Sequence, residues 1–282
     1  MSPSKRKTLK AFRPRRLWHY CLLILVSLII LFPLFWLLVS SFKTPAEYTA
    51  YPIKFLPARL NYYNYLSVLY YPPFTSALLR TFGLSVTTAA ITCITSAMAG
   101  YAFARIGGKG SKPLFTVVLV LLILPSIVLL IPQFILYARL KMVDTYWPWY
   151  LAAFCATNPL YIFLYRQFFL GFPRELEEAA EMDGASPFQV FFQIFLPNSK
   201  PAVATILIFA FNAVWGDFIM PVMFLNDPSQ LLGTSMAPGY FPPRYYPTFL
   251  AGTVIYILPM VIFFLLIQKN IQKGFLFTGL RS

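Results

Sequence analysis

Long apolar runs alternate with short polar segments along the chain, and each run is close to the ~20 residues that a transmembrane helix needs. Only helices and closed barrels satisfy their backbone hydrogen bonds in lipid, and apolar runs of this length favour helices. We therefore predict an all-α polytopic membrane protein with six transmembrane helices. The expected spans are residues 17–40, 77–104, 113–137, 147–170, 201–225 and 248–268.

Several expected spans contain proline, namely Pro125, Pro132, Pro159 and Pro221. A proline inside a helix frees a backbone carbonyl. Lipid does not tolerate an unpaired carbonyl, whereas a packed interface or a wet cavity does. We expect these prolines to lie against protein or water.

Composition agrees with a chain that lies mostly in lipid. Hydrophobic residues make up 59% of the sequence and charged residues 11%, against about 25% charged in a typical soluble domain. The net charge of +14 does not indicate nucleic acid, because the basic residues flank apolar runs. Three cysteines lie singly in different runs and His19 is the only histidine, so neither a disulfide framework nor a metal site is expected.

Lysine and arginine set the expected orientation, because they favour the cytoplasmic side. With the amino end inside, the inner segments hold sixteen of these residues and the outer segments six. The expected inner segments are a basic cytoplasmic tail (1–16), the turn 105–112, the segment 166–200 and a cytoplasmic C-terminal tail (269–282). Both termini are therefore predicted to be cytoplasmic, with residues 41–76 as an external loop.

The external loop is rich in tyrosine and contains five prolines, which argue against one continuous helix. Two interpretations stay open for its aromatic residues. They form either an interfacial belt or a surface that docks a partner.

The expected second span carries a face of small residues, and the turn that follows it is basic. Thr92, Ser96, Gly100 and Ala104 recur every four positions, which allows another helix to approach closely. The following sequence RIGGKGSK lacks the GxxxxGK[ST] spacing of a phosphate-binding loop, so we interpret it as a basic cytoplasmic turn.

The polar stretch 171–197 holds five of the nine acidic residues and is predicted to fold as helix, turn, helix. Pro173 suits a first helical turn, and the acids that follow suit the positive end of the helix dipole. Gly184 provides a stop, because glycine adopts the left-handed conformation without steric cost. Ser186, Pro187 and Gln189 are typical of an N-cap, a proline at the first helical position and a capping-box partner. Pro197 limits the second helix.

The spacing within this stretch resembles the EAA loop of ATP-binding-cassette (ABC) importer permeases. The matching positions are Glu178, Ala179, Ala180, Gly184, Ile194, Leu196 and Pro197. In that family the loop carries a coupling helix that sits in a cleft of a cytoplasmic ATPase. The resemblance implies that these residues and Asp183, within a coupling loop at 171–200, dock the ATPase. The alternative is an amphipathic loop helix that merely caps the bundle.

Further segments resemble permeases of the carbohydrate uptake class, of the maltose or oligosaccharide type. They are SFKTPAEY after the first span, GYAFARI (100–106), LLIPQFILYARLKMVDTYW (129–147) and WGDFIMPVMFL (215–225). By this resemblance residues 77–268 form a type I permease domain with five transmembrane helices. One departure is Gly216, where the family more often has asparagine.

The resemblance implies a transport subunit in a bacterial or archaeal cytoplasmic membrane, not an enzyme. Its implied partners are a second permease, two copies of a cytoplasmic ATPase, an extracytoplasmic solute-binding protein and a sugar. The chain itself would need no cofactor, since the partner subunits bind ATP. Two alternatives stay open: a permease of the same class for a glycerol phosphodiester or phosphorylated polyol, and a polytopic membrane enzyme.

Asp217 is the one acidic residue inside the expected spans, where an ionisable group is costly and usually functional. With Asn212 and Trp215 nearby, one hypothesis is a sugar site. The carboxylate and amide would then bind hydroxyls, and the indole would cover the ring face. The alternative is a hydrogen bond between helices.

Overall fold

The computed structural model describes residues 14–237 and 246–279, and within these ranges every regular element is helical, as predicted. The elements are α1 (Pro14–Ser41), α2 (Pro45–Tyr48), α3 (Tyr63–Leu69), α4 (Pro72–Tyr101), the π-helical turn η1 (Ala102–Ile106), α5 (Ser111–Ile123), α6 (Ser126–Arg139), α7 (Trp147–Phe154), α8 (Pro159–Leu170), α9 (Glu175–Met182), α10 (Pro187–Val190), the π-helical turn η2 (Phe191–Phe195), α11 (Leu196–Asn198), α12 (Lys200–Trp215), α13 (Ile219–Phe224), the 3₁₀ turn η3 (Pro228–Gln230), α14 (Leu232–Ser235) and α15 (Tyr246–Gly279).

Three helices in the described ranges are long and apolar enough to cross a membrane: Trp18–Ser41, Pro72–Ile106 and Tyr246–Leu266. The number rises to five if two sharply bent pairs, α5 with α6 and Pro187–Asn198 with α12, each count as one span. The protein is therefore built to pass through the membrane several times. The expected count of six stays a prediction.

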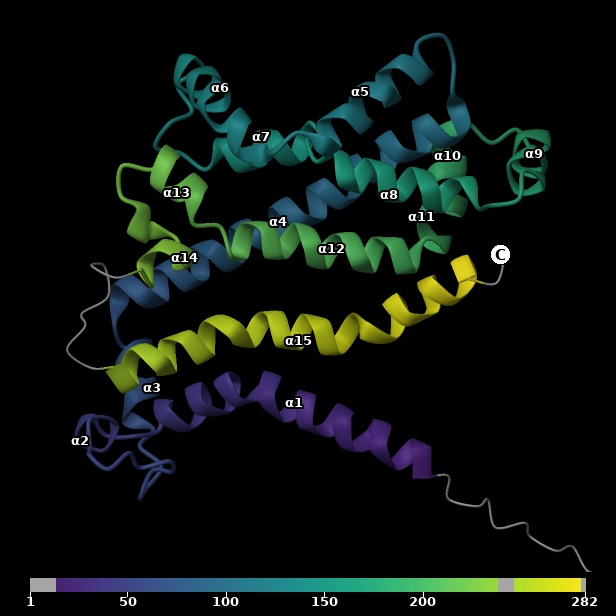
Figure 1. Cartoon of the computed structure of the whole chain (residues 1–282). Coiled ribbons are helices and arrows are strands. Elements are labelled where there is room, and N and C mark those ends of the chain that lie inside the picture. Colours follow the sequence, from purple (N-terminus) through teal and green to yellow (C-terminus); the bar gives the residue numbers. More distant parts are fainter. Residues whose placement is uncertain (1–13, 238–245, 280–282) are drawn as a thin grey trace, which may run out of the picture.

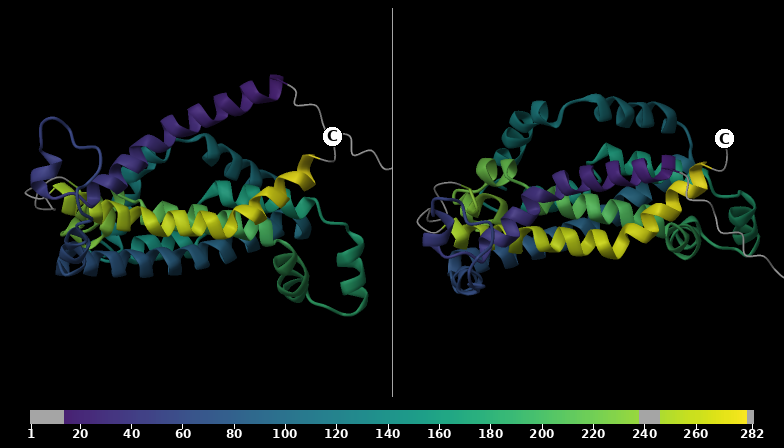
Figure 2. Two further views of the ribbon diagram at one scale, coloured as in Figure 1. Left: turned by 90° about the horizontal axis from the view of Figure 1, so that it is seen from below. Right: turned by 60° about the horizontal axis from the view of Figure 1, so that its bottom comes forward.

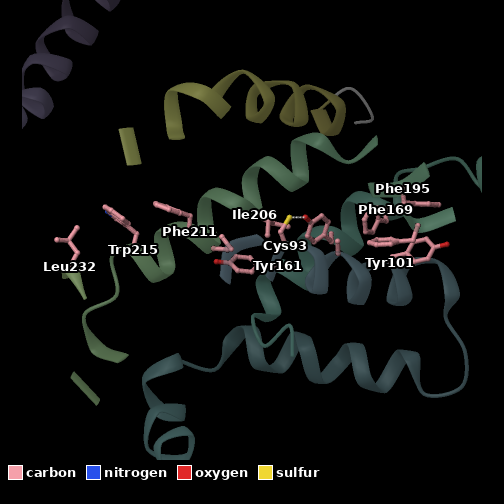
Figure 3. Packing of buried hydrophobic residues seen from close by; sticks show 14 of the residues in the cluster. Cys93, Tyr101, Tyr161, Phe169, Phe195, Ile206, Phe211, Trp215 and Leu232 are labelled. Atoms are coloured by element: carbon pink, nitrogen blue, oxygen red, sulfur yellow. Dashed lines mark hydrogen bonds between the residues drawn. The ribbon is translucent and has the colours of Figure 1, made fainter. Parts of the chain in front are cut away.

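Helices α4, α8, α12 and α15 run side by side and form the main bundle, in which α12 packs against both α4 and α15 (Figure 1). Buried side chains follow its length in one row, from Leu232 through Trp215, Phe211 and Ile206 to Phe195 (Figure 3). Helix α1 contacts α15 and then diverges from it toward Pro14 (Figures 1 and 2).

Three of the expected spans are interrupted. The third divides into α5 and α6, which meet at 110°. Leu124 is extended because it precedes Pro125, and proline excludes the helical conformation from the residue before it. The fourth divides into α7 and α8, where Asn158 caps a new helix that begins with Pro159. In the fifth, α12 ends at Trp215 and α13 begins only at Ile219.

At the carboxyl end, helix α15 continues to Gly279 and includes most of the expected tail at 269–282. Residues 1–13 of the expected basic tail and residues 280–282 lie outside the described part of the chain.

The predicted external loop (41–76) is ordered by hydrogen bonds to its backbone. The Asn64 amide donates to the carbonyls of Ser41 and Lys43, at 2.7 and 2.9 Å. Glu47 accepts from the N–H groups of Thr44 and Ala58, and these bonds lower the pKa of its carboxyl group. Several tyrosines remain exposed, Tyr51, Tyr62, Tyr63 and Tyr70 among them. Both interpretations of the aromatic residues therefore stay open.

The small-residue face of α4 includes the point of closest approach to α8. A Cβ atom at Gly100 would lie 2.5 Å from the Cβ of Tyr165 and 3.0 Å from the backbone nitrogen of Arg166. Real Cβ atoms do not approach so closely, so only glycine permits this packing. Gly83, on the same helix, has no atom within 4 Å of a Cβ position.

Gly100→Ala should destabilise the protein by about 1–3 kcal/mol, because the new methyl group overpacks the contact between α4 and α8. Gly83→Ala is the matched control. It should be neutral or stabilise by up to about 1 kcal/mol, because alanine is the better helix former. Thermal unfolding of both variants in detergent tests the difference, and equal shifts in Tm would contradict the account of the close contact.

Candidate functional site

The coupling loop (171–200) folds as two short helical segments that project from one end of the bundle (Figure 2). The first, α9, ends in a Schellman motif: Gly184 N–H donates to the Glu181 carbonyl and Ala185 N–H to the Ala180 carbonyl, both at 3.0 Å. Gly184 has φ = +78°, which confirms the predicted left-handed stop. The motif fixes the angle between the two segments.

The second segment begins at the predicted capping box. Gln189 N–H donates to the Ser186 hydroxyl, and Ser186 N–H donates to the Gln189 side chain at 2.7 Å. Pro187 occupies the first turn. The helical run continues through η2 to Asn198 and turns by 83° into α12. The predicted start of this segment is confirmed.

The structure divides the eight predicted docking residues into two groups. Ala180, Ile194 and Leu196 are half-buried and pack on the core. The exposed group is Glu178, Ala179, Asp183, Gly184 and Pro197. Between the two segments lies an open pocket of about 350 Å³, and its lining includes Ala180, Asp183, Gly184 and Ile194. The structure thus brings residues from both halves of the motif to one concave surface.

Sequence reasoning missed the exposed apolar side chains of the same two helical segments. Met182 is 88% exposed and Phe188 is 62% exposed, and Leu176 and Phe192 are also exposed. The rings of Phe188 and Phe192 stack with centroids 5.9 Å apart. Phe188 and Phe192 lie four residues apart in the sequence FQVFF, and this helical spacing could have indicated an apolar face. It presents apolar surface at an end of the molecule where acidic residues are also exposed.

A buried arginine, which sequence reasoning also missed, holds the loop to the bundle. Arg105 lies on η1, and its side chain is 5% exposed. Its Nη2 donates to the carbonyls of Phe169, at 2.8 Å, and Phe172, and its Nη1 lies 3.7 Å from a Glu177 carboxylate oxygen. The guanidinium also lies 5.2 Å from the ring centroid of Phe195. We call these contacts the Arg105 clamp. Arg105 belongs to the quoted GYAFARI segment and also begins the basic sequence RIGGKGSK, but neither indicated a buried side chain.

Aromatic packing surrounds the clamp, as Figure 3 shows for Tyr101, Phe169 and Phe195. The Tyr101 ring lies 4.9 Å from that of Phe195 and 5.3 Å from that of Phe191, centroid to centroid. Its hydroxyl donates to Glu177 at 3.5 Å. Two π-helical turns, η1 and η2, thus meet at this point, and such turns occur frequently at functional sites.

The residues predicted to line a solute path lie at the other end of α12. Trp215 is 1% exposed, its indole N–H donates to the Tyr256 carbonyl at 2.9 Å, and its ring stacks on Phe211 and Tyr256. Asp217 accepts from the indole N–H of Trp149 at 3.0 Å and from Met220 N–H at 3.1 Å. This geometry favours the interhelical alternative for Trp215 and Asp217.

Asn212 is exposed. Solute contact by any of Asn212, Trp215 and Asp217 stays a prediction. Within the described ranges, no three His, Cys, Asp or Glu side chains lie close enough together to hold a metal ion.

Residues 96–275 match the family model of the binding-protein-dependent transport system inner membrane component. This range includes the coupling loop, the Arg105 clamp and most of the main bundle. The chain belongs to this family. It is therefore a multi-pass inner-membrane component of a transport system and not an enzyme.

Relatives and a solved structure agree with this assignment. The chain is 31% identical to the arabinooligosaccharides transport system permease protein AraQ of Halalkalibacterium halodurans, over 91% of this chain and 93% of AraQ. It is 28% identical to the sulfoquinovosyl glycerol transport system permease protein SmoH of Agrobacterium fabrum, over 89% of each chain. In fold it matches a chain of a bacterial ABC transporter that imports alginate, with a TM-score of 0.77, 21% identity and coverage of 95% of this chain and 99% of that chain.

Asp217→Ala should destabilise the protein by about 1–3 kcal/mol, because it leaves the Trp149 indole N–H and the Met220 N–H without their acceptor. Asn212→Ala, near the end of α12 and exposed, should stay within about 0.5 kcal/mol of wild type. Thermal unfolding in detergent measures both. If Asp217→Ala is as stable as wild type, the interhelical role is contradicted and the hypothesis of a solute contact by this carboxylate is favoured.

Proposed function

We propose that this chain is one of two permease subunits that together form the pathway of a binding-protein-dependent ABC importer for an oligosaccharide. The family assignment and the likeness to AraQ support this proposal. A solute-binding protein would deliver the sugar to the outer mouth, and two cytoplasmic ATPases would drive the cycle. The sequence contains no phosphate-binding loop of the GxxxxGK[ST] type, so ATP would bind only to those partners.

The observation that carries the proposal is the geometry of the coupling loop. Four of its predicted docking residues, Ala180, Asp183, Gly184 and Ile194, line one open pocket on a projection from the bundle, and the side chains of Met182 and Phe188 are exposed on the same projection. A fixed projection that exposes apolar side chains is suited to a cleft in a partner protein, since exposed apolar patches commonly mark interaction sites. We assign that partner as the ATPase.

The orientation follows from the same arrangement. The coupling loop, the basic turn after η1 and the carboxyl end of α15 lie at one end of the molecule, and the Pro14 end of α1 points the same way (Figure 1). The excess of lysine and arginine belongs to these segments, which supports a cytoplasmic position for this end and for both termini. Six passes satisfy this arrangement if each of the two bent pairs counts as one span and α7 and α8 together make another.

The proposed cycle is a two-state switch. Closure of the ATPase dimer would move the coupling loop, and the bundle would change from inward-facing to outward-facing around the solute path. A loaded binding protein at the outer mouth would bias the same equilibrium from the other side.

A second candidate solute contains glycerol or another polyol. The 28% identity to SmoH, whose name specifies sulfoquinovosyl glycerol, favours it. The two candidates share the same subunit composition and the same coupling loop. Uptake of labelled arabinooligosaccharides and of a glycerol glycoside by cells that express the complete transporter would separate them.

Gly184→Trp should insert into the membrane at normal abundance but lose the ATPase. Apart from its two neighbours in the chain, no described residue has an atom within 4 Å of a Cβ at position 184, so the indole would project into the surface that the partner occupies. The positive φ adds a strain of roughly 1 kcal/mol or more for a residue with a side chain. Membrane abundance and co-purification of the ATPase are the measurements.

Gly184→Asn is the matched control, because asparagine tolerates the left-handed conformation and has a smaller side chain. Glu178→Gln is a second control, since an exposed charge contributes under about 1 kcal/mol. Both should keep the ATPase. Normal co-purification by Gly184→Trp would show that this loop is not the docking element.

A further inference from the structure

The Arg105 clamp connects α9 to the bundle, to which the backbone joins this helix only through a short linker. Helix α9 projects away from the bundle and follows α8 after the short linker 171–174 (Figures 1 and 2). The second segment, by contrast, is anchored by buried rings, because Phe191 and Phe195 lie in the core. The orientation of α9 therefore depends on the few contacts it makes with the bundle.

The polar contact of α9 with the bundle is concentrated at one residue. Glu177 is half-buried and meets both Arg105 and Tyr101, whereas Glu175, Glu178 and Glu181 are exposed. Ala180 adds a small apolar contact with the core. The carboxylate of Glu177 is thus the point at which α9 is tied to the inner end of α4.

The arginine fits this position for a physical reason. A guanidinium is planar, always charged and carries five N–H donors in a fixed fork. Here the fork meets two carbonyls near the end of α8, where the helix dipole is negative, together with the Glu177 carboxylate and the Phe195 ring. A lysine ammonium is a point charge on a flexible stem and could not hold the same three segments at once.

We propose that Arg105 is a positioning residue that fixes α9 to the inner end of α4, so that the coupling loop and α4 move as one body. The inference rests on the proposed docking of the coupling loop to an ATPase. Since α4 packs along α12 and α8, a displacement of α9 would pass directly into the bundle instead of being absorbed in the linker. The family motif at Glu178 to Pro197 does not contain this residue.

A second arginine, Arg166, also contacts the turn η1 that follows α4. Its Nε donates to the Phe103 carbonyl at 3.4 Å, and its guanidinium lies 4.0 Å from the ring centroid of Phe115. Arg166 thereby ties η1 to α8 and α5, but it does not reach α9 in these contacts. Arg105 is the arginine on this turn that contacts the coupling loop.

The test is a distance measurement between spin labels at Glu181→Cys on α9 and Lys109→Cys on the turn after η1, both exposed positions. The background carries serine at Cys21, Cys93 and Cys155. The labelled chain is studied in the assembled transporter by pulsed electron paramagnetic resonance, without nucleotide and after trapping with ATP and vanadate. With Arg105 intact, we expect one narrow distance distribution that is the same in both states.

Arg105→Ala should broaden this distribution and make it differ between the two states, because α9 would follow the ATPase without carrying α4. Arg105→Lys is a second variant, chosen in case Arg105→Ala does not fold. It keeps the positive charge but lacks the planar fork of donors, so it should also broaden the distance distribution. Glu177→Gln should reproduce the effect of Arg105→Lys. Arg174→Ala, which removes an exposed arginine at the start of α9, is the matched control and should leave the distribution narrow.

Two outcomes would overturn the proposal while the ATPase still co-purifies. One is a narrow, state-independent distribution in both Arg105 variants, and the other is a state-dependent distance with Arg105 intact. Failure of the ATPase to co-purify with the chain that keeps Arg105 would instead contradict the docking role of the coupling loop. The two failures are therefore distinguishable.

Discussion

The hydrogen bonds from Arg105 to backbone carbonyls near the end of α8 are the interaction on which the arrangement of the coupling loop depends. A helix end leaves its last carbonyls without partners, and a buried carbonyl is costly. Arg105 supplies donors to the carbonyls of Phe169 and Phe172, close to the end of α8. The same group meets Glu177 and Phe195, so the pairing of one helix end also positions both segments of the coupling loop. Loss of the arginine would take one donor from each of these carbonyls and remove the positive charge beside the half-buried Glu177 carboxylate, which is why we place it at the centre of the account.

The all-helical fold and the helix–turn–helix of the coupling loop could be predicted from local chemistry. Gly184 and the pair Ser186 and Gln189 act through hydrogen bonds to neighbours within a few residues, so their spacing is sufficient. The interruptions were only partly foreseen. Proline was expected to free carbonyls, yet whether a span bends by 110°, as at Pro125, depends on packing with distant helices. The end of α15 at Gly279 could not be predicted from charge, because lysine marks the edge of an apolar span but does not stop a helix.

The candidate site divides in a similar way. The motif from Glu178 to Pro197 is contiguous enough to be recognised, and four of the eight predicted docking residues line one pocket. The clamp could not be read from the sequence, because Arg105 and Glu177 are far apart in the chain and either residue alone is typical of a solvated surface. For Trp215 and Asp217 the sequence indicated a site, but it could not show which protein groups lie beside them. Their side chains suited a sugar site, but the fold places Tyr256 and Trp149 beside them as hydrogen-bond partners.

The central claim is that an ATPase binds the coupling loop of this chain. Hydrogen–deuterium exchange of the chain, alone and in complex with its ATPase, tests this claim most directly, because short exposed helices exchange quickly unless a partner covers them. The account predicts strong protection of the amides from Leu176 to Phe192 on binding, with little change in the external segment around Asn64. Unchanged exchange in the coupling loop, with protection elsewhere on the cytoplasmic end, would contradict it.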